Sequence, residues 1–390
     1  MFIKLIGGNF DNCGDHLMLI AATAALRCFQ PQPRIVTSIL GQSTYEQRAF
    51  LGLYQTLPTA KRLSMFSTFG VPVLRRYGHL FGIIPDEEVD LFLDMSGYAY
   101  ADRWGLEVIQ NRFLYYQKLK RDGKKVVFLP QAFGPLEQAA SKKLMAKLLA
   151  LADLVFARDS FSYKQLLQIN SSAKVRLAPE FTQVLNPMES NVFSDCVAIV
   201  PNIQVIKQGS ISEDSYLSFW EKVILAIRCI GFRPLVVQFS QTADVPLVEE
   251  IHRRHHDIQV IRSSDPLKLK GAIATCRAAV CSRFHSFVSA LSSGVPAATT
   301  AWSHKYVEFA RDYEMEEFVL DVHADESHIN RVIRTLCCDR YEELSQKLVA
   351  FALELRQKIY EMWSTVARLA NLDFPTNADI SSRTGGYTTQ

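Results

Sequence analysis

The chain has 390 residues, and its 43 Lys+Arg against 40 Asp+Glu leave a formal net charge of +3. This length favours two domains, each large enough to bury its own hydrophobic core. The near balance of charge excludes a general attraction to nucleic acid, so we expect no nucleic-acid partner and only local binding of anions.

The eight cysteines are scattered, with Cys337 and Cys338 adjacent and no C-x-x-C pair. This pattern is typical of neither a disulfide framework nor a zinc site, and it favours a reducing cytoplasm. We expect no metal and no cofactor. The N-terminal run MFIKLIGG is too short for the core of a signal peptide, which favours a cytoplasmic protein.

Short apolar runs rich in Val, Ile, Leu and Phe alternate with helical patterns along most of the chain. Such runs are typical of strands buried on both faces, which form parallel sheets when helices separate them. The expected strands cover residues 2–8, 34–40, 90–97, 125–134, 153–159, 175–180, 196–202, 234–240, 258–264, 278–284, 296–302 and 317–322. The prediction is an α/β fold with two Rossmann-like, doubly wound domains that face each other across a cleft.

The strand pattern pauses at residues 186–195, a polar stretch with Pro, Asn and Ser. We place the domain boundary there, which gives an N-terminal domain over 1–185 and a C-terminal domain over 196–338. Residues 340–370 then show apolar side chains at spacings of three and four, as in a long amphipathic helix. Residues 371–390 lack this pattern and are expected to form a flexible tail.

No Asp, Glu, Lys or Arg lies between Arg283 and Lys305. The stretch approaches the roughly 20 apolar residues that a membrane span needs. However, Gly294, Pro296, His285 and many Ser and Thr residues favour a buried passage through a globular domain. We therefore expect no integral membrane segment.

Charged side chains flank this stretch at the ends of two expected strands. Arg283 and His285 follow one strand, and Lys305 follows the next one after Ser303, a favourable helix N-cap. A right-handed crossover sets consecutive strands side by side, and anions bind at such strand ends, where helices begin. We expect Arg283, His285 and Lys305 to converge on one pocket.

Arg158 has a similar position in the N-terminal half, at the end of a strand and before a helix capped by Asp159 or Ser160. If the two sheets face each other, Arg158 can reach the same anion from the other side of the cleft. The alternative is local, with Arg158 paired to Asp159 and Arg283 solvated at a helix start.

Polar residues also follow three other strands of the N-terminal half, beside glycines that permit tight turns. They could line a site for a sugar acceptor: Asn9, Asn12, Asp15, Ser96 and Gln131. The alternative for Asn12 and Asp15 is a structural role as helix caps. The glycines do not form the dinucleotide fingerprint G-x-G-x-x-G.

Together these motifs resemble the polysaccharide pyruvyl transferases. The matching segments are NFDNCGDHLML, DLFLDMSGYAY, LPQAFGPL, FARDSFSYKQL, LAPEF and SRFHSFVSALSSGVPAATTAWSHKYVEFARDY, in the order of the family. The resemblance implies a glycosyltransferase-B-like pair of domains and a phosphoenolpyruvate pocket built from Arg158, Arg283, His285 and Lys305. The chain departs from the family at Ser96 and Ala132, where glycines are usual, in the half expected to hold the acceptor.

The resemblance implies transfer of the enolpyruvyl unit of phosphoenolpyruvate onto a sugar of a polysaccharide precursor, as a pyruvate ketal. Arginines suit the phosphate and carboxylate of this donor because their planar fork binds either group in a bidentate manner. His285 is the candidate general acid that protonates the methylene carbon. Alternatively, His285 is a phosphate ligand and another group supplies the proton.

Two other functions stay open. A nucleotide-sugar glycosyltransferase of the same fold would bind UDP or GDP in the C-terminal half, and a non-catalytic sugar-binding relative would keep only the fold. The expected partners are phosphoenolpyruvate and a nucleotide-linked or lipid-linked sugar. A lipid-linked acceptor would bring the protein to the periphery of the inner membrane. The sequence is also compatible with a homo-oligomer.

Overall fold

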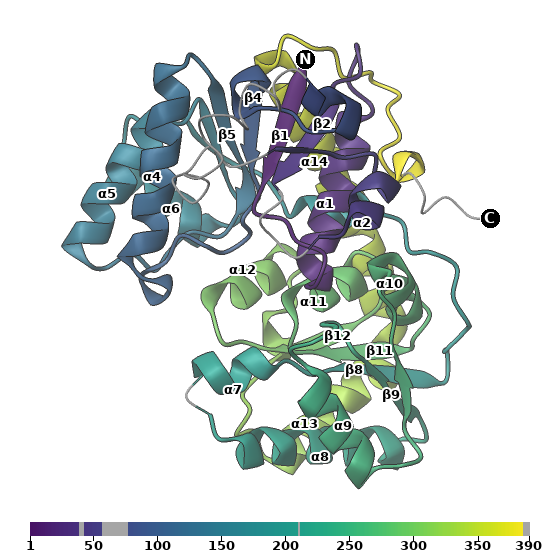
Figure 1. The fold of residues 1–390 in the computed structure, drawn as a ribbon. Coiled ribbons are helices and arrows are strands. Elements are labelled where there is room, and N and C mark those ends of the chain that lie inside the picture. The colour runs from purple at the N-terminus through teal and green to yellow at the C-terminus, as the bar shows by residue number, and fades with distance from the viewer. Residues whose placement is uncertain (39–42, 57–76, 210, 385–390) are drawn as a thin grey trace.

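The computed structural model describes residues 1–38, 43–56, 77–209 and 211–384. Its strands form two parallel sheets, each with helices on both faces (Figure 1). The first sheet has seven strands in the order β3-β2-β1-β4-β5-β6-β7, and the second has six in the order β10-β9-β8-β11-β12-β13. The prediction of two doubly wound α/β sheets is therefore confirmed.

The first sheet uses strands from the N-terminal half. They are β1 (Phe2–Ile6), β2 (Arg34–Ser38), β3 (Tyr54–Thr56), β4 (Leu91–Asp94), β5 (Lys125–Gln131), β6 (Leu154–Ala157) and β7 (Val175–Leu177). The helices of this half are α1 (Cys13–Leu26), α2 (Tyr45–Phe50), η2 (Gly78–Phe81), η3 (Asp86–Glu88), η4 (Asp102–Trp104), α4 (Leu106–Arg121), α5 (Ala139–Leu151), α6 (Ser160–Ile169) and η5 (Phe181–Val184).

The second sheet follows the connecting segment that includes the expected boundary at 186–195. Its strands are β8 (Cys196–Val200), β9 (Arg233–Val237), β10 (Gln259–Ile261), β11 (Ala278–Cys281), β12 (Ala297–Thr300) and β13 (Val319–Leu320). Its helices are α7 (Ile203–Gly209), α8 (Glu213–Cys229), α9 (Val245–Arg254), α10 (Pro266–Ala274), α11 (Phe284–Leu291), α12 (His304–Asp312), η6 (Glu316–Phe318), α13 (Glu326–Arg334) and η7 (Thr335–Asp339).

Every expected strand is present, although residues 39–40 of the second one lie outside the described residues. The sequence did not predict β3, which has only three residues at the edge of the first sheet. Such a short run contains too few residues for a strand period to stand out.

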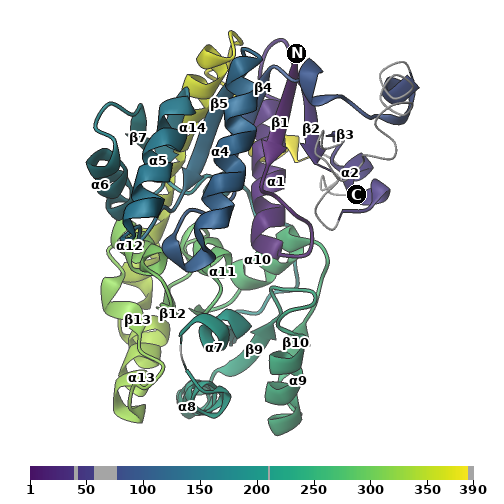
Figure 2. The same cartoon turned by 60° about the vertical axis from the view of Figure 1, so that its left-hand side comes forward.

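Helix α1 joins the two halves. All of its side chains except Asp15 are buried, because α1 packs against the first sheet on one side and against α10 and α11 of the second half on the other. Figure 2 shows its N-terminus pointing down onto α10 and α11. The first turn of α1 therefore reaches the boundary between the halves.

The long helix expected over 340–370 corresponds to α14 (Tyr341–Leu369), which runs from the second half back to the first. Near its start, the Ser345 hydroxyl donates to the Gly294 carbonyl at 2.8 Å, and at its end the Leu369 carbonyl accepts from Lys125 Nζ at 2.7 Å. Among the described residues, no helix combines the length and apolar character needed to cross a bilayer.

The segment after α14 differs from the expected flexible tail over its described part. Residues 371–384, which include η8 (Ser381–Arg383), return to the N-terminal half. Asp373 exchanges two backbone hydrogen bonds with Gln30, and Ile380 is fully buried. These contacts place residues 371–384 against the N-terminal half, while residues 385–390 lie outside the described chain.

Candidate active site

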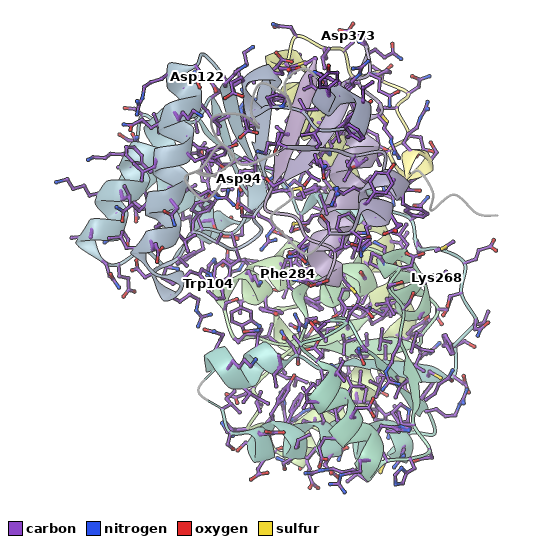
Figure 3. The ribbon with its side chains drawn as sticks, in the orientation of Figure 1. Asp94, Trp104, Asp122, Lys268, Phe284 and Asp373 are labelled. Carbon is purple, nitrogen blue, oxygen red and sulfur yellow. The ribbon has the colours of Figure 1, made fainter. Side chains whose placement is uncertain are left out.

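A cavity of about 350 Å³ lies between the two halves, at the carboxyl ends of both sheets. Side chains from both halves line it: Asn12, Asp15, Met18, Ser96, Tyr98, Trp104, Arg158, Asn202, Gln204, Phe239, Arg283, Phe284, His285, Trp302, Lys305 and Tyr306. Figure 3 shows Trp104 and Phe284 at the level where the halves meet. The cavity thus contains all four residues expected to bind phosphoenolpyruvate.

The helices that begin at or next to this cavity include α1, α6, α7, α11 and α12. The N-termini of α1 and α6 are capped by the side chains of Asn12 and Asp159. Among the described residues, no side chain caps α11 or α12. Ser303 has the N-cap position of α12, as expected, but its hydroxyl makes no hydrogen bond to the helix. Uncapped N–H groups at a helix start favour an anion.

Arg158 enters the cavity from the first half. Its guanidinium is buried, donates from Nη1 to Glu180 at 2.6 Å, and lies 4.2 Å from the ring centre of Phe284, a residue of the second half. Nη2 has no hydrogen-bond partner among the described residues. Arg158 therefore crosses the cleft and pairs with Glu180, and Asp159 caps α6.

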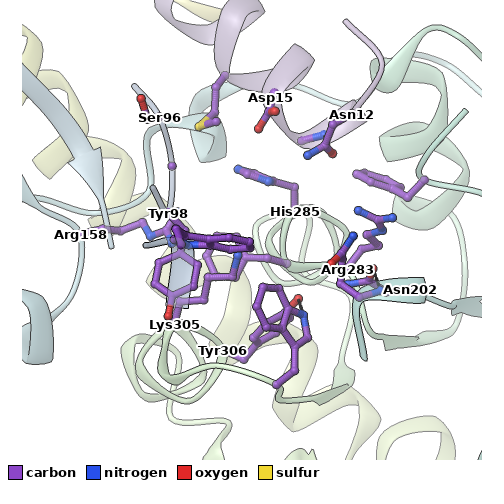
Figure 4. Close-up of a pocket in the computed structure, with 18 residues that line it drawn as sticks. Asn12, Asp15, Ser96, Tyr98, Arg158, Asn202, Arg283, His285, Lys305 and Tyr306 are labelled. Atoms are coloured by element: carbon purple, nitrogen blue, oxygen red, sulfur yellow. Dashed lines mark hydrogen bonds between the residues drawn. The ribbon is translucent and has the colours of Figure 1, made fainter. Parts of the chain in front are cut away.

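Arg283 lies on the other side of the cavity (Figure 4). Its Nε and Nη2 atoms bind the two carboxylate oxygens of Asp244 at 2.8 and 2.6 Å. Burial, the largest single effect, would lower the pKa of Arg283, but the charge and hydrogen bonds of the fully buried Asp244, with Tyr306 and Tyr216, together raise it. Arg283 is thus held by a bidentate ion pair, and it is not a solvated residue.

His285 lies between Arg158 and Arg283 in the view of Figure 4. Its Nε2 atom is buried without a hydrogen-bond partner among the described residues and lies 3.9 Å from Glu180 Oε1. Its Nδ1 atom faces Gly14, where an added Cβ would collide with the ring. Burial lowers the pKa of His285 to about 4, against the opposing charge of Glu180. In the empty cavity the imidazole is neutral at pH 7.

Lys305 is surrounded by aromatic rings. Its Nζ lies 5.0 Å from the ring centres of Tyr98 and Trp302, 5.2 Å from Phe284 and 5.5 Å from Tyr306. These faces hold the ammonium in place by cation–π attraction without neutralising it. Burial lowers the pKa of Lys305 to about 7, and Arg158 acts in the same direction. Lys305 therefore titrates near neutrality.

Three of the five candidate acceptor residues line the cavity, namely Asn12, Asp15 and Ser96. Asn12 caps α1, whereas Asp15 lies in its first turn and is not the cap. Burial raises the pKa of Asp15 to about 7, and the charge of Lys305 opposes this shift. The Ser96 hydroxyl donates to the buried Asp94 at 2.7 Å.

The other two candidates lie behind the cavity wall. Asn9 donates to Asp15 and accepts from the backbone N–H groups of Asp11 and Asn12. Gln131 is fully buried and donates to the Asp94 carbonyl at 3.1 Å. Neither side chain lines the cavity, since each is used to fix the loop that follows a strand.

The sequence reasoning missed Glu180 and Asp244, which have no exposed surface and are the carboxylates that hold the two arginines. Glu180 lies in the LAPEF segment, which resembles the family, but the sequence predicted no role for this glutamate. Pairing between residues far apart in sequence gives no local signal. It also missed the aromatic residues around Lys305. Among the described residues, no group of three or more His, Cys, Asp or Glu side chains could hold a metal.

Residues 12–304 match the polysaccharide pyruvyl transferase family. The chain belongs to this family. The match spans the elements that carry Asn12, Arg158, Arg283 and His285, and it ends one residue before Lys305. No curated protein matches the sequence significantly.

Solved structures with a similar fold cover nearly the whole chain. A putative UDP-N-acetylglucosamine 2-epimerase from Listeria monocytogenes has a TM-score of 0.61 at 10% identity, covering 96% of this chain and 98% of its own. HepE from Anabaena, in complex with UDP and glucose, has a TM-score of 0.58 at 10% identity, covering 95% and 99%. These likenesses show that the fold is glycosyltransferase-B-like.

Proposed function

We propose that this member of the polysaccharide pyruvyl transferase family transfers the enolpyruvyl unit of phosphoenolpyruvate onto two hydroxyls of a sugar, as a pyruvate ketal. The observation that carries the proposal is the convergence of Arg158, Arg283, His285 and Lys305, from both halves, on one cavity. Phosphoenolpyruvate has two anionic groups on either side of its reactive carbon. Two arginines on either side of His285 suit that arrangement (Figure 4).

Each arginine keeps donors for the substrate in this proposal. Arg158 uses Nη1 for Glu180 and leaves Nη2 unpaired within the described chain, and Arg283 uses Nε and Nη2 for Asp244 and leaves Nη1. The carboxylates balance the buried charges of the empty site, so they lower the cost of burying both guanidinium groups. Lys305 adds a cation that has no ion pair within 4.0 Å in the described chain.

In the proposed reaction His285 protonates the methylene carbon of phosphoenolpyruvate, which generates an oxocarbenium-like centre at the neighbouring carbon. One sugar hydroxyl adds to this centre and loses its proton. The carbon–oxygen bond to phosphate breaks, inorganic phosphate leaves, and the second hydroxyl closes the ketal. Of the two protons that the hydroxyls release, one restores protonated His285 and the other leaves with phosphate. The negative charge of bound phosphoenolpyruvate favours the imidazolium, which offsets the low pKa of His285 in the empty cavity.

The test is to incubate the protein with phosphoenolpyruvate and a panel of nucleotide-linked and lipid-linked sugars, measuring phosphate release and the mass of the product. We expect release that depends on the acceptor, and a loss of about 100-fold or more in kcat for His285→Ala. The control is His256→Ala. This variant removes an exposed histidine just before the edge strand β10, at the amino end of that strand, whereas the cavity lies at the carboxyl ends of the strands.

Sugar transfer from a UDP- or GDP-sugar without any use of phosphoenolpyruvate would instead favour the glycosyltransferase alternative. Sugar binding without turnover of either donor would favour a non-catalytic relative. Either result contradicts the proposed ketal transfer.

A further inference from the structure

Glu180 is the carboxylate closest to the proposed acid. It follows β7 directly before η5, has no exposed surface, and accepts from Arg158 at 2.6 Å through Oε2 and from the backbone N–H of Thr182 at 3.2 Å through Oε1. Burial, the largest single effect, would raise its pKa, but the charge and hydrogen bond of Arg158, the charge of His285 and the Thr182 N–H together lower it. Glu180 is therefore ionised at neutral pH, and its position is fixed from two directions.

The two nitrogens of the His285 ring lie in different surroundings. Nε2 is fully buried, has no hydrogen-bond partner within the described chain, and has Glu180 Oε1 as an ion-pair neighbour at 3.9 Å. Nδ1 faces Gly14, which lines the cavity. A buried nitrogen beside a carboxylate is favourable only as an N–H, because a lone pair there would face negative charge.

From this geometry we infer that Glu180 is the positioning residue for His285: it keeps a proton on Nε2, directs Nδ1 toward the substrate, and stabilises the imidazolium when the ring is protonated. The inference rests on the proposed function for its role in turnover. The distance of 3.9 Å shortens to hydrogen-bond length by a shift of about 1 Å, on the scale of the tightening seen when substrates bind.

The other charged groups around the ring act in the opposite direction. Arg158, Lys305 and Lys270 lower the pKa of His285, as does its burial, and Glu180 raises it. In the empty cavity, removing the charge of Glu180 therefore leaves only contributions that disfavour the imidazolium. Without this carboxylate the pKa of His285 falls, with or without substrate, and less of the acid form is present near that pKa.

The matched pair of variants is Glu180→Gln and Asp244→Asn. Each neutralises a fully buried carboxylate that pairs with a cavity arginine, but only Glu180 lies beside His285. For a general acid, kcat falls as pH rises through the pKa in the substrate complex. We expect Glu180→Gln to shift this fall of kcat to lower pH by about one unit or more. Asp244→Asn should raise KM for phosphoenolpyruvate and leave the pH at which kcat falls unchanged.

A second measurement does not depend on turnover. In protein labelled with ¹⁵N-histidine, the His285 signals, assigned with His285→Ala, report which nitrogen carries the proton. We expect the Nε2–H tautomer at pH 7 in the wild type, and loss of this preference in Glu180→Gln, with circular dichroism to confirm folding. A wild-type Nδ1–H tautomer, or a pH profile unchanged in folded Glu180→Gln, would overturn the inference.

The two proposals can fail separately. If the protein shows no transfer from phosphoenolpyruvate but His285 keeps the expected tautomer and its dependence on Glu180, the proposed function fails and the pairing stands. If transfer occurs but the tautomer is the opposite one, the proposed function stands and the role of Glu180 fails.

Discussion

At the residue scale, burial controls the charge of the site. His285, Lys305 and Asp15 all have pKa values shifted toward their neutral forms, to about 4, 7 and 7, because the cavity wall removes them from water. Arg158 and Arg283 keep their charge because each has a buried carboxylate partner. The empty site is thus close to neutral, and an incoming anion supplies the charge that favours protonated His285 and Lys305.

A pH dependence of binding follows from Lys305. Its pKa of about 7 means that the ammonium is present below this pH and is lost as pH rises through it. We expect the affinity for phosphoenolpyruvate, measured by calorimetry, to fall about tenfold for each unit of pH above the pKa of Lys305 in the free protein, and to level off once the pH passes the higher pKa of Lys305 in the complex.

The control is Lys305→Arg, since arginine stays charged throughout this range. The variant should bind with an affinity that changes much less between pH 7 and 9 than that of the wild type, with the remaining change due to Asp15, whose pKa is also about 7. A wild-type affinity that is flat over the same range would contradict the role of Lys305.

At the element scale, helix starts fix the geometry of the cavity. The first turns of α1 and α11 meet there, and Gly14 leaves the space that the His285 ring occupies. Gly14 does not have a positive φ, so the requirement for glycine is steric. A side chain at this position would have to displace the imidazole or separate the two halves.

Gly14→Ala tests this contact. Its Cβ would collide with His285 Nδ1, so we expect kcat to fall about 10- to 100-fold through misplacement of the ring. The overpacked contact should also lower stability by about 1 to 3 kcal/mol, and the helix preference of alanine offsets at most about 1 kcal/mol of this loss. The control is Gly209→Ala in α7, where the nearest atom to the new Cβ is the end of the Ile211 side chain at 3.3 Å.

At the scale of the whole molecule, the chain leaves the first half, builds the second, and returns. Helix α14 packs against η5, and the segment after it pairs with Gln30. Trp363 of α14 is fully buried, with ring contacts to Phe29 and Phe181 of the N-terminal half at 6.2 and 6.0 Å. We therefore propose that the C-terminal part of α14 and residues 371–384 complete the N-terminal domain expected over 1–185.

Trp363→Ala is expected to lower the free energy of unfolding by about 3 to 5 kcal/mol, because a large buried ring is lost. Trp363→Phe should cost less than about half as much, since it keeps an aromatic ring and removes an indole N–H that has no partner in the described chain. Urea denaturation followed by circular dichroism measures both. Equal stability of Trp363→Ala and the wild type would contradict the proposed packing role.

Most of the fold could be predicted because its signals are local. Apolar runs of strand length with helical patterns between them predict parallel sheets, and the long amphipathic pattern predicts α14. What could not be predicted, β3 and the packing of residues 371–384, depends on short segments that are stable only against the rest of the chain. No periodicity marks such segments.

The sequence by itself determined the family, the two-sheet fold, and the convergence of Arg283, His285 and Lys305, because residues at the ends of adjacent parallel strands must lie close together. Only the tertiary structure decided that Arg158 crosses the cleft, and that Glu180 and Asp244 are the partners of the arginines. The physical reason is that ion pairing and burial depend on distances in space between residues far apart in the chain, and no local pattern encodes those distances.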